Sequence, residues 1–185
     1  MRIVTVENYL TPEQCAQLSA VTQYGHDNNQ MTLGKYTELR YTSRIDTSLY
    51  TYPQSVLDTA TQIRAYCGVA SYPIISGQGS DGIVTTYMPT GADIFSYQAT
   101  GETIEGQLQG QLWSFVITQP TESGGVTQIN GVDYPVGQGD LLVYLTSNNT
   151  QYTTPVTGGT TRICWSFGNY VPTEAWESGQ IVVGG

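Results

Sequence analysis

The chain of 185 residues is poor in charge: only 11% of its residues are charged, and fifteen acidic residues against six basic ones give a net charge of −9 at pH 7. Nucleic-acid binding is not expected, because it needs a cluster of lysines and arginines to displace the counterions of phosphates. The length suits a single domain with a sizeable core, so residues 1–185 are expected to form one domain. No run of about 18 apolar residues predicts a membrane span.

The cysteines indicate buried thiols rather than a metal site or a disulfide framework. Cys15, Cys67 and Cys164 are an odd number, and their spacing matches no metal motif. Each lies in an apolar pattern, so three buried, reduced thiols and a reducing compartment are expected. The opening Met1-Arg-Ile-Val resembles a strand and not a signal peptide.

The first elements are a strand and a capped helix. Ile3–Tyr9 alternates as a strand does. Thr11 is a candidate N-cap and Gln14 completes a capping box, which predicts a helix over residues 12–23. The single histidine, His26, then falls in a turn-like loop, where a solvated side chain is expected.

A second helix is predicted over residues 54–67. Pro53 suits its start, and Gly68 suits the position just past its end. Its apolar face is expected to comprise Val56, Leu57, Ala60, Ile63 and Cys67. Residues 1–70 are therefore expected to form a helical N-terminal part.

From residue 83 onward the chain reads as short strands separated by Gly, Pro, Asn and Ser turns, which is typical of a sandwich or barrel. Asn130-Gly131 is a strong hairpin signal. Residues 83–170 are expected to form this β core and residues 174–185 a tail. The predicted strands are Ile83–Tyr87, Ile94–Tyr97, Leu112–Thr118, Val126–Ile129, Leu141–Leu145 and Thr161–Phe167.

Three motifs in the last third carry a family resemblance. They are Gly124-Gly-Val-Thr127, Pro135-Val-Gly-Gln-Gly139 and the run from Gln151 through Pro155-Val156 to Arg162. In this order and spacing they resemble the C-terminal half of an iron(II)/2-oxoglutarate-dependent oxygenase of the prolyl hydroxylase type. The resemblance implies a mostly β fold: a double-stranded β-helix (jelly-roll) core with about two flanking helices.

The positions that the resemblance assigns to iron ligands carry other residues. Counting from Tyr87-Met-Pro-Thr-Gly91, the first two fall on Tyr97 and Ala99, and the third falls on Gln151. Iron(II) is held in this family by two imidazoles and a carboxylate, whereas an amide and a phenol hold it poorly. We therefore expect no metal, no cofactor and no catalysis, and interpret the chain as a degenerate member. The nearby acids Asp93, Glu102 and Glu105 are interpreted as exposed loop residues.

Arg162 remains from the family pattern, where it pairs with the distal carboxylate of 2-oxoglutarate. Alternation places Arg162, Cys164 and Ser166 on one face of a strand, expected to be the barrel interior. A guanidinium there needs an anionic partner. Two interpretations are open: a retained small-acid pocket, with Tyr87 as a leftover hydroxyl, or an internal salt bridge, which is favoured.

The favoured function is a non-catalytic structural or binding protein that acts through protein–protein contacts. The Thr-, Tyr-, Gln- and Gly-rich composition resembles that of bacteriophage virion proteins, which implies a capsid, neck or tail accessory protein assembled in the host cytoplasm. The alternatives are an active peptidyl hydroxylase and a small-acid or carbohydrate-binding module. In the tail, Ile181, Val182 and Val183 are predicted to add as a strand to another virion subunit or another copy; the alternative is that they fold back on their own barrel.

Overall fold

The computed structural model describes the backbone of residues 1–33, 43–45, 52–75, 82–91, 94–97 and 102–185. Its largest element is an eight-stranded antiparallel sheet, the main sheet, ordered β1-β11-β7-β14-β4-β3-β2, with β6 paired to β7. Its strands are β1 (Ile3–Val6), β2 (Met31–Leu33), β3 (Ser43–Ile45), β4 (Ile83–Met88), β6 (Glu102–Ile104), β7 (Gln107–Gln119), β11 (Leu141–Leu145) and β14 (Arg162–Pro172).

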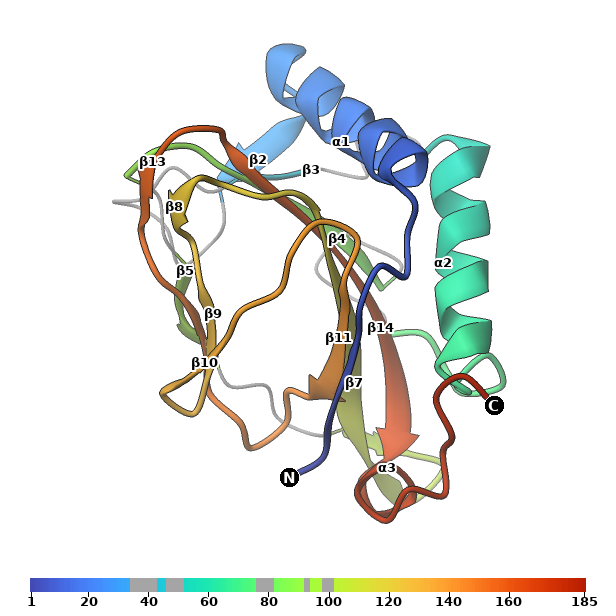
Figure 1. Cartoon of the computed structure of the whole chain (residues 1–185). Helices are drawn as coiled ribbons and strands as arrows, with labels where there is room; N and C mark the ends of the chain where they lie inside the picture. The colour runs from blue at the N-terminus through green and yellow to red at the C-terminus, as the bar shows by residue number, and fades with distance from the viewer. Residues whose placement is uncertain (34–42, 46–51, 76–81, 92–93, 98–101) are drawn as a thin grey trace.

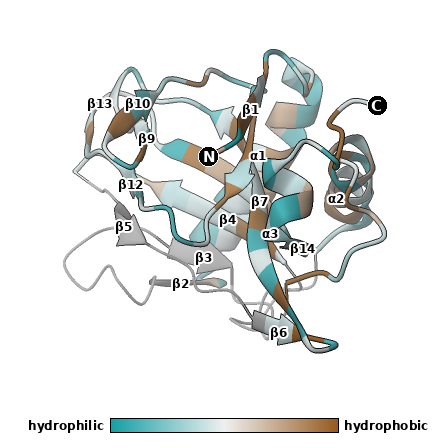
Figure 2. Ribbon diagram, turned by 90° about the horizontal axis from the view of Figure 1, so that it is seen from below, coloured by the Kyte–Doolittle hydropathy of each residue, from teal (hydrophilic) through white to brown (hydrophobic). Residues whose placement is uncertain are grey.

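A second, four-stranded sheet faces the main sheet and closes the barrel (Figure 1). It has the order β10-β9-β12-β5, and a two-stranded sheet of β13 and β8 lies beside it. Helices α1 (Pro12–Asp27) and α2 (Gln54–Tyr66) lie on the outer side of the main sheet, and Figure 2 shows the same order of layers from below. This is the predicted jelly-roll core with flanking helices. The remaining strands are β5 (Ile94–Tyr97), β8 (Ser123–Gly124), β9 (Thr127–Ile129), β10 (Val132–Tyr134), β12 (Gln151–Thr153) and β13 (Val156–Gly158).

Helix α1 (Pro12–Asp27) begins at the predicted capping box. The Thr11 hydroxyl accepts from the Gln14 backbone N–H at 3.1 Å, and the Gln14 side chain accepts from the Thr11 N–H at 3.0 Å. The helix runs one turn further than predicted because Asn28 caps it, with its side-chain amide donating to the Tyr24 carbonyl oxygen at 2.8 Å. His26 therefore lies in the last helical turn and not in a loop.

Helix α2 (Gln54–Tyr66) has nearly the predicted bounds. Its buried stripe comprises Val56, Ala60 and Ile63, continued by Cys67, at the helical spacing of three or four residues. Leu57 was assigned to the same face, which is wrong: it lies one residue off the stripe and is 40% exposed. Gly68 has a φ of +74°, and a Cβ there would lie 2.7 Å from the Val182 carbonyl oxygen, so glycine is required at this helix end.

The largest hydrophobic core lies between the main sheet and helices α1 and α2; we call it the helix-side core. Trp165 and Phe167 of β14 point into it with their rings stacked at a centroid distance of 6.4 Å. The Trp165 indole N–H donates to the Leu18 carbonyl oxygen at 3.2 Å, so this large side chain leaves no donor unpaired. Other buried members include Cys15, Val56, Ile63, Leu112, Leu141, Val143 and Val171.

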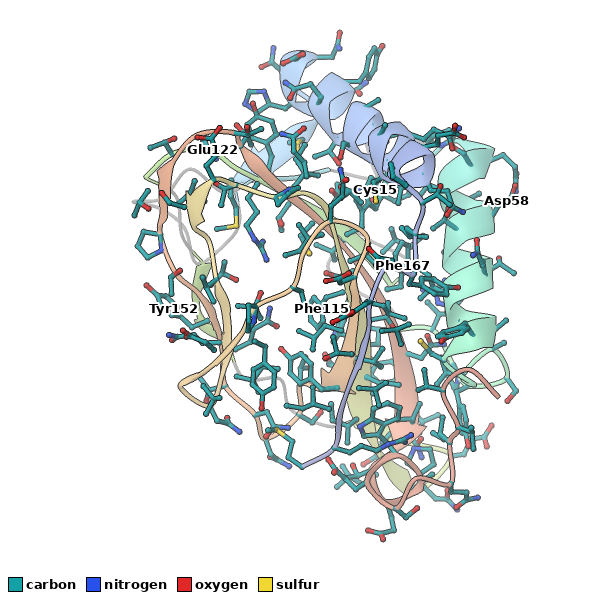
Figure 3. The ribbon with its side chains drawn as sticks, in the orientation of Figure 1. Cys15, Asp58, Phe115, Glu122, Tyr152 and Phe167 are labelled. Atoms are coloured by element: carbon teal, nitrogen blue, oxygen red, sulfur yellow. The ribbon has the colours of Figure 1, made fainter. Side chains whose placement is uncertain are left out.

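The second core fills the barrel interior, between the main sheet and the second sheet. Its fully buried members are Ile129, Leu142 and Tyr144, and Phe115 stacks on Tyr144 with a centroid distance of 5.4 Å. Figure 3 shows Phe115 between the two sheets and Phe167 on the helix side. The main sheet is therefore buried on both faces, which explains the unbroken apolar run of β11.

Two turns follow from glycines in the sequence. Asn130 and Gly131 have φ values of +51° and +81° and join β9 to β10, as the Asn-Gly pair predicts. Gly139, the last residue of the Pro-x-x-x-Gly motif, has a φ of +79°, and a Cβ there would lie 2.4 Å from the Leu10 carbonyl oxygen. That glycine therefore lets the turn before β11 pack against the entry to α1.

All three cysteines are buried and free, as predicted. Burial raises the pKa of the Cys15, Cys67 and Cys164 thiols. In the part of the chain that the structure describes, no helix is long and apolar enough to cross a membrane.

The C-terminal segment corrects one prediction. After a short helix α3 (Thr173–Glu177), the chain folds back on its own domain. Ile181 is only 4% exposed and belongs to the helix-side core, and its carbonyl oxygen accepts from the Arg2 guanidinium at 2.8 Å. The guanidinium of Arg2 also lies 4.0 Å over the Trp176 ring. Ile181 to Val183 therefore form no strand, and the Ile181 side chain is not available to a partner.

We expect the C-terminal segment to contribute to stability. Ile181→Ala should lower the free energy of unfolding by about 2–4 kcal/mol, because it empties a buried site. Val182→Ala is the matched control: Val182 is 57% exposed, so its effect should stay within about 0.5 kcal/mol. Urea denaturation measures both. A variant lacking residues 179–185 that melts normally and loses self-association would contradict this view of the segment.

Candidate functional site

The barrel interior contains one charged side chain among the residues whose side chains are described, that of Arg162 at the start of β14. Alternation along β14 places Ile163, Trp165 and Phe167 in the helix-side core, as predicted. Arg162 points the other way and reaches β9 of the second sheet, where its Nη2 donates to the Thr127 hydroxyl at 3.2 Å. The side chain thus bridges the two sheets of the barrel.

Arg162 is deeply buried, with 3% of its surface exposed. Its Nη1 points to the Met88 sulfur at 3.4 Å, and its Nε has no hydrogen-bond partner. A thioether is a weak acceptor, so two of the three guanidinium nitrogens lack a good one. Burial lowers the pKa of Arg162, because desolvation disfavours the charged form.

The Gly-Gly-x-Thr motif explains how the chain approaches Arg162. Gly124 has a φ of +74°, and a Cβ there would lie 2.0 Å from the Pro155 carbonyl oxygen. A Cβ at Gly125 would lie 2.9 Å from the Arg162 Cδ. The two glycines therefore let the backbone pass close to Pro155 and Arg162, and Thr127 then faces the guanidinium two residues later.

Further unpaired polar atoms face the same interior. In the described part of the chain four buried side-chain oxygen or nitrogen atoms lack a partner, among them Thr86 Oγ1, Thr153 Oγ1 and Arg162 Nε. Thr153 pairs across the strands with Thr127, and Thr86 pairs with Cys164, which follows Arg162 by two residues. Two unpaired hydroxyls thus lie on strand faces beside Arg162, whose own Nε is unpaired as well, although buried polar groups are normally hydrogen-bonded.

The internal salt bridge favoured from sequence is not found among the described residues. The two ion pairs there join Met1 to Glu177 and His26 to Asp27. Cys164 cannot serve as a counterion, because burial raises the pKa of its thiol and keeps it neutral. Arg162 is therefore a buried cation with no carboxylate among its described neighbours.

Gln151, the expected third ligand position, is held by a hydrogen bond. The Tyr144 hydroxyl donates to the Gln151 side-chain oxygen at 2.5 Å. Tyr144 is fully buried, and burial raises the pKa of its hydroxyl well above the usual range. Gln151 is directly opposite Tyr97 on β5, so the second sheet brings together two of the three expected positions; Ala99 lies outside the described residues.

Iron does not fit this arrangement. Gln151 offers an amide oxygen that already accepts a hydrogen bond from a neutral phenol. No group of three or more His, Cys, Asp or Glu side chains that could hold a metal ion occurs within the described ranges. The single histidine, His26, stacks on Tyr87 at a centroid distance of 3.9 Å on the helix side of the main sheet. It therefore lies across that sheet from Gln151.

Tyr87 is not part of the interior, which corrects its assignment to an acid-binding pocket. It pairs with Ile163, whose side chain is in the helix-side core, and it packs against that core itself. Met88, one residue later, faces Arg162 instead. Adjacent residues of a strand point to opposite faces, so Tyr87 and Met88 of β4 lie on opposite sides of the main sheet.

Sequence reasoning missed four interior residues: Thr86, Met88, Tyr144 and Thr153. Met88 and Thr86 follow from the register of β4 with β14, which no motif encodes. The interior position of Thr153 could have been predicted from the sequence, because Thr153 lies two residues after Gln151 and so shares its face of the strand. Tyr144 lies in an apolar run that gives no sign of which face each residue takes.

The fold defined by these elements is that of the 2-oxoglutarate-dependent oxygenases. The chain superposes on a Pseudomonas putida prolyl-4-hydroxylase with a TM-score of 0.63 at 13% identity, covering 92% of both chains. A viral collagen prolyl hydroxylase from Paramecium Bursaria Chlorella virus-1 gives 0.65 at 10% identity, covering 92% of this chain and 97% of that one.

A Trichoplax adhaerens prolyl hydroxylase, solved with a peptide of hypoxia inducible factor, gives a TM-score of 0.66 at 10% identity, covering 91% of this chain and 83% of that one. No protein-family model and no curated protein matches the sequence. At these identities the comparisons establish the fold, and the chemistry must be argued from the residues of this chain.

We expect Arg162→Met to stabilise the protein in Tris chloride buffer free of carboxylates. A buried charge without a counterion is costly, so the gain should be about 1 kcal/mol or more in the free energy of unfolding. Arg64→Met is the matched control. Arg64 is also buried, but it donates to the Asn169 side-chain oxygen and the Gly82 carbonyl oxygen, both at 3.2 Å.

Arg64→Met should therefore lower the free energy of unfolding by about 1–3 kcal/mol, whereas Arg162→Met should raise it. Guanidinium chloride denaturation of the two variants and the parent chain measures both effects. A destabilised Arg162→Met protein would show that Arg162 is satisfied in the unliganded barrel.

Proposed function

We propose that this chain is a non-catalytic, metal-independent binding protein that holds a small acid inside its oxygenase-type barrel at Arg162. The observation that carries the proposal is the buried guanidinium with an unpaired Nε and no described carboxylate neighbour. A carboxylate accepts two parallel hydrogen bonds from a guanidinium. It would supply both the missing acceptor and the missing counter-charge.

The expected partner and setting remain predictions. Contacts with other virion subunits or copies of this chain, and the phage origin, are tested by none of the described contacts. Their test is mass spectrometry of purified particles, which asks whether the chain is present in stoichiometric amounts. The carbohydrate-binding alternative has no specific observation in its favour.

The active-hydroxylase alternative has an observation against it. An oxygenase of this fold needs imidazole and carboxylate ligands that leave iron positions open. Here Gln151 accepts from Tyr144, and Tyr97 stands opposite Gln151. The Gln151 amide oxygen already accepts from the Tyr144 phenol, and an amide and a phenol hold Fe(II) poorly.

Metal titration tests the metal-independent part of this proposal. Calorimetry with Mn(II), with and without 2-oxoglutarate, is expected to show no saturable site tighter than roughly millimolar. EDTA should leave the Tm unchanged. Gln151→His should behave as the parent chain does, because a single imidazole beside Tyr97 and Ala99 completes no ligand set. Micromolar binding to the parent chain would overturn the proposal.

Acid binding tests the role of Arg162. Propionate is expected to raise the Tm over an equal concentration of chloride, since a ligand that binds only the folded state stabilises it by about 2.7 kcal/mol at one hundred times its Kd. Arg162→Met should abolish the rise in Tm. Arg64→Met should show the same rise, starting from a lower Tm without the acid. Equal rises in the parent chain and Arg162→Met would place the acid elsewhere and refute the proposal.

A further inference from the structure

The Gln151 side chain is held so that it offers a ligand only one of its two polar groups. Tyr144 is fully buried, and its hydroxyl donates to the Gln151 side-chain oxygen at 2.5 Å. A buried hydroxyl without an acceptor is costly, so this bond keeps the amide in one of its two orientations. An amide has an acceptor oxygen and a donor N–H₂ group. With its oxygen engaged, Gln151 presents a hydrogen-bond donor to a ligand.

The second sheet places this donor on the same face as the contact of Arg162. Gln151 precedes Thr153 by two residues on β12, so the two side chains share one face of the strand. Thr153 is directly opposite Thr127 on β9, and the Thr127 hydroxyl accepts from the Arg162 guanidinium at 3.2 Å. Two residues of strand span about 7 Å. An acid with its carboxylate at Arg162 therefore needs a chain of only a few carbon atoms to reach the Gln151 amide.

The buried Cys164 thiol lies near both ends of this path. Cys164 follows Arg162 by two residues on β14 and shares its face. Burial raises the pKa of Tyr144, and the nearby Cys164 thiol adds to the rise. Burial also lowers the pKa of Arg162, and the same thiol opposes that change. The guanidinium and the Tyr144–Gln151 pair therefore belong to one polar region of the interior.

Building on the proposed acid-binding function, we infer that Gln151 is a specificity-determining residue of the Arg162 site. The ligand is a short carboxylic acid that carries an oxygen acceptor a few carbon atoms away from the carboxylate that Arg162 binds. The Gln151 N–H₂ group donates to that acceptor. An aliphatic acid of the same length would cover the N–H₂ group without pairing it, which is unfavourable. An amide donates to neutral and charged oxygens alike, so the inference concerns the acceptor and not its charge.

The experiment compares pentanoate with 4-oxopentanoate, which has the same chain length and charge and adds one acceptor oxygen. Calorimetry uses the full chain at pH 7 and constant ionic strength, without metal. We expect 4-oxopentanoate to bind about fivefold more tightly, as one additional hydrogen bond provides. Gln151→Met should bind the two acids equally, with an affinity for pentanoate close to that of the parent chain.

Gln128→Met is the matched control. Gln128 lies on β9 of the same sheet, and its side-chain amide donates to the exposed Asp133 carboxylate at 2.8 Å. This variant should keep the preference for 4-oxopentanoate. The double variant Tyr144→Phe/Gln151→Met removes both partners of the interior hydrogen bond, so that no hydroxyl is left unpaired. It should bind the two acids equally, as Gln151→Met does.

The outcomes separate this inference from the function on which it rests. Equal affinities for the two acids in the parent chain would overturn the inference and leave the acid-binding function standing. A preference for 4-oxopentanoate that persists in Gln151→Met and in the double variant would do the same, because the acceptor would then be recognised by another group. Absence of binding by both acids to the parent chain would overturn the inference and the acid-binding function together.

Discussion

The burial of one guanidinium between two sheets is the physical constraint that shapes the barrel interior. The Arg162 side chain extends from β14 of the main sheet to the second sheet, where its guanidinium donates to the Thr127 hydroxyl. The backbone opposite passes so close to this side chain that a Cβ would not fit. Gly125 meets this condition, because a Cβ there would lie 2.9 Å from the Arg162 Cδ. A guanidinium in this position is costly unless an anion pairs with it. The protein keeps the whole arrangement, which includes the Gly-Gly-x-Thr turn, although its single histidine, His26, lies on the other face of the main sheet.

The Tyr144–Gln151 hydrogen bond occupies the position that the family resemblance assigns to the third iron ligand. An unpaired buried polar group costs about 1–3 kcal/mol. Tyr144 is fully buried, so its hydroxyl requires an acceptor, and the Gln151 oxygen provides one. A histidine at position 151 would present a ring nitrogen instead of this amide oxygen. The Tyr144 hydroxyl is thus paired, whereas the Arg162 Nε is not.

Local signals in the sequence predicted the elements well, and long-range packing decided what they missed. The Thr11–Gln14 capping box and the Asn130-Gly131 turn depend on a few adjacent residues, and both formed as predicted. The Ile181 segment was ambiguous, because β-branched residues between glycines suit a sheet edge or a core equally well. Its burial depends on Arg2 and Trp176, which no local pattern connects to it. Tyr87 and Met88 illustrate the same limit: the strand was predicted, but which neighbour faces Arg162 depends on register.

The two cores differ in how completely their polar groups are paired. The helix-side core holds the large aromatic residues Trp165 and Phe167 together with both helices, and its polar groups, such as Thr22 and Thr85, are paired. The interior core is smaller, and the strand faces beside it carry the Arg162 Nε and the hydroxyls of Thr86 and Thr153, which have no hydrogen-bond partner. Because side chains alternate along β14, its two faces can differ. One face is packed in the helix-side core, while the other carries a buried charge with no described counterion. A domain in which the main core supplies the stability can tolerate such a cost at one site, and it is on this local departure from full pairing that the proposed acid binding rests.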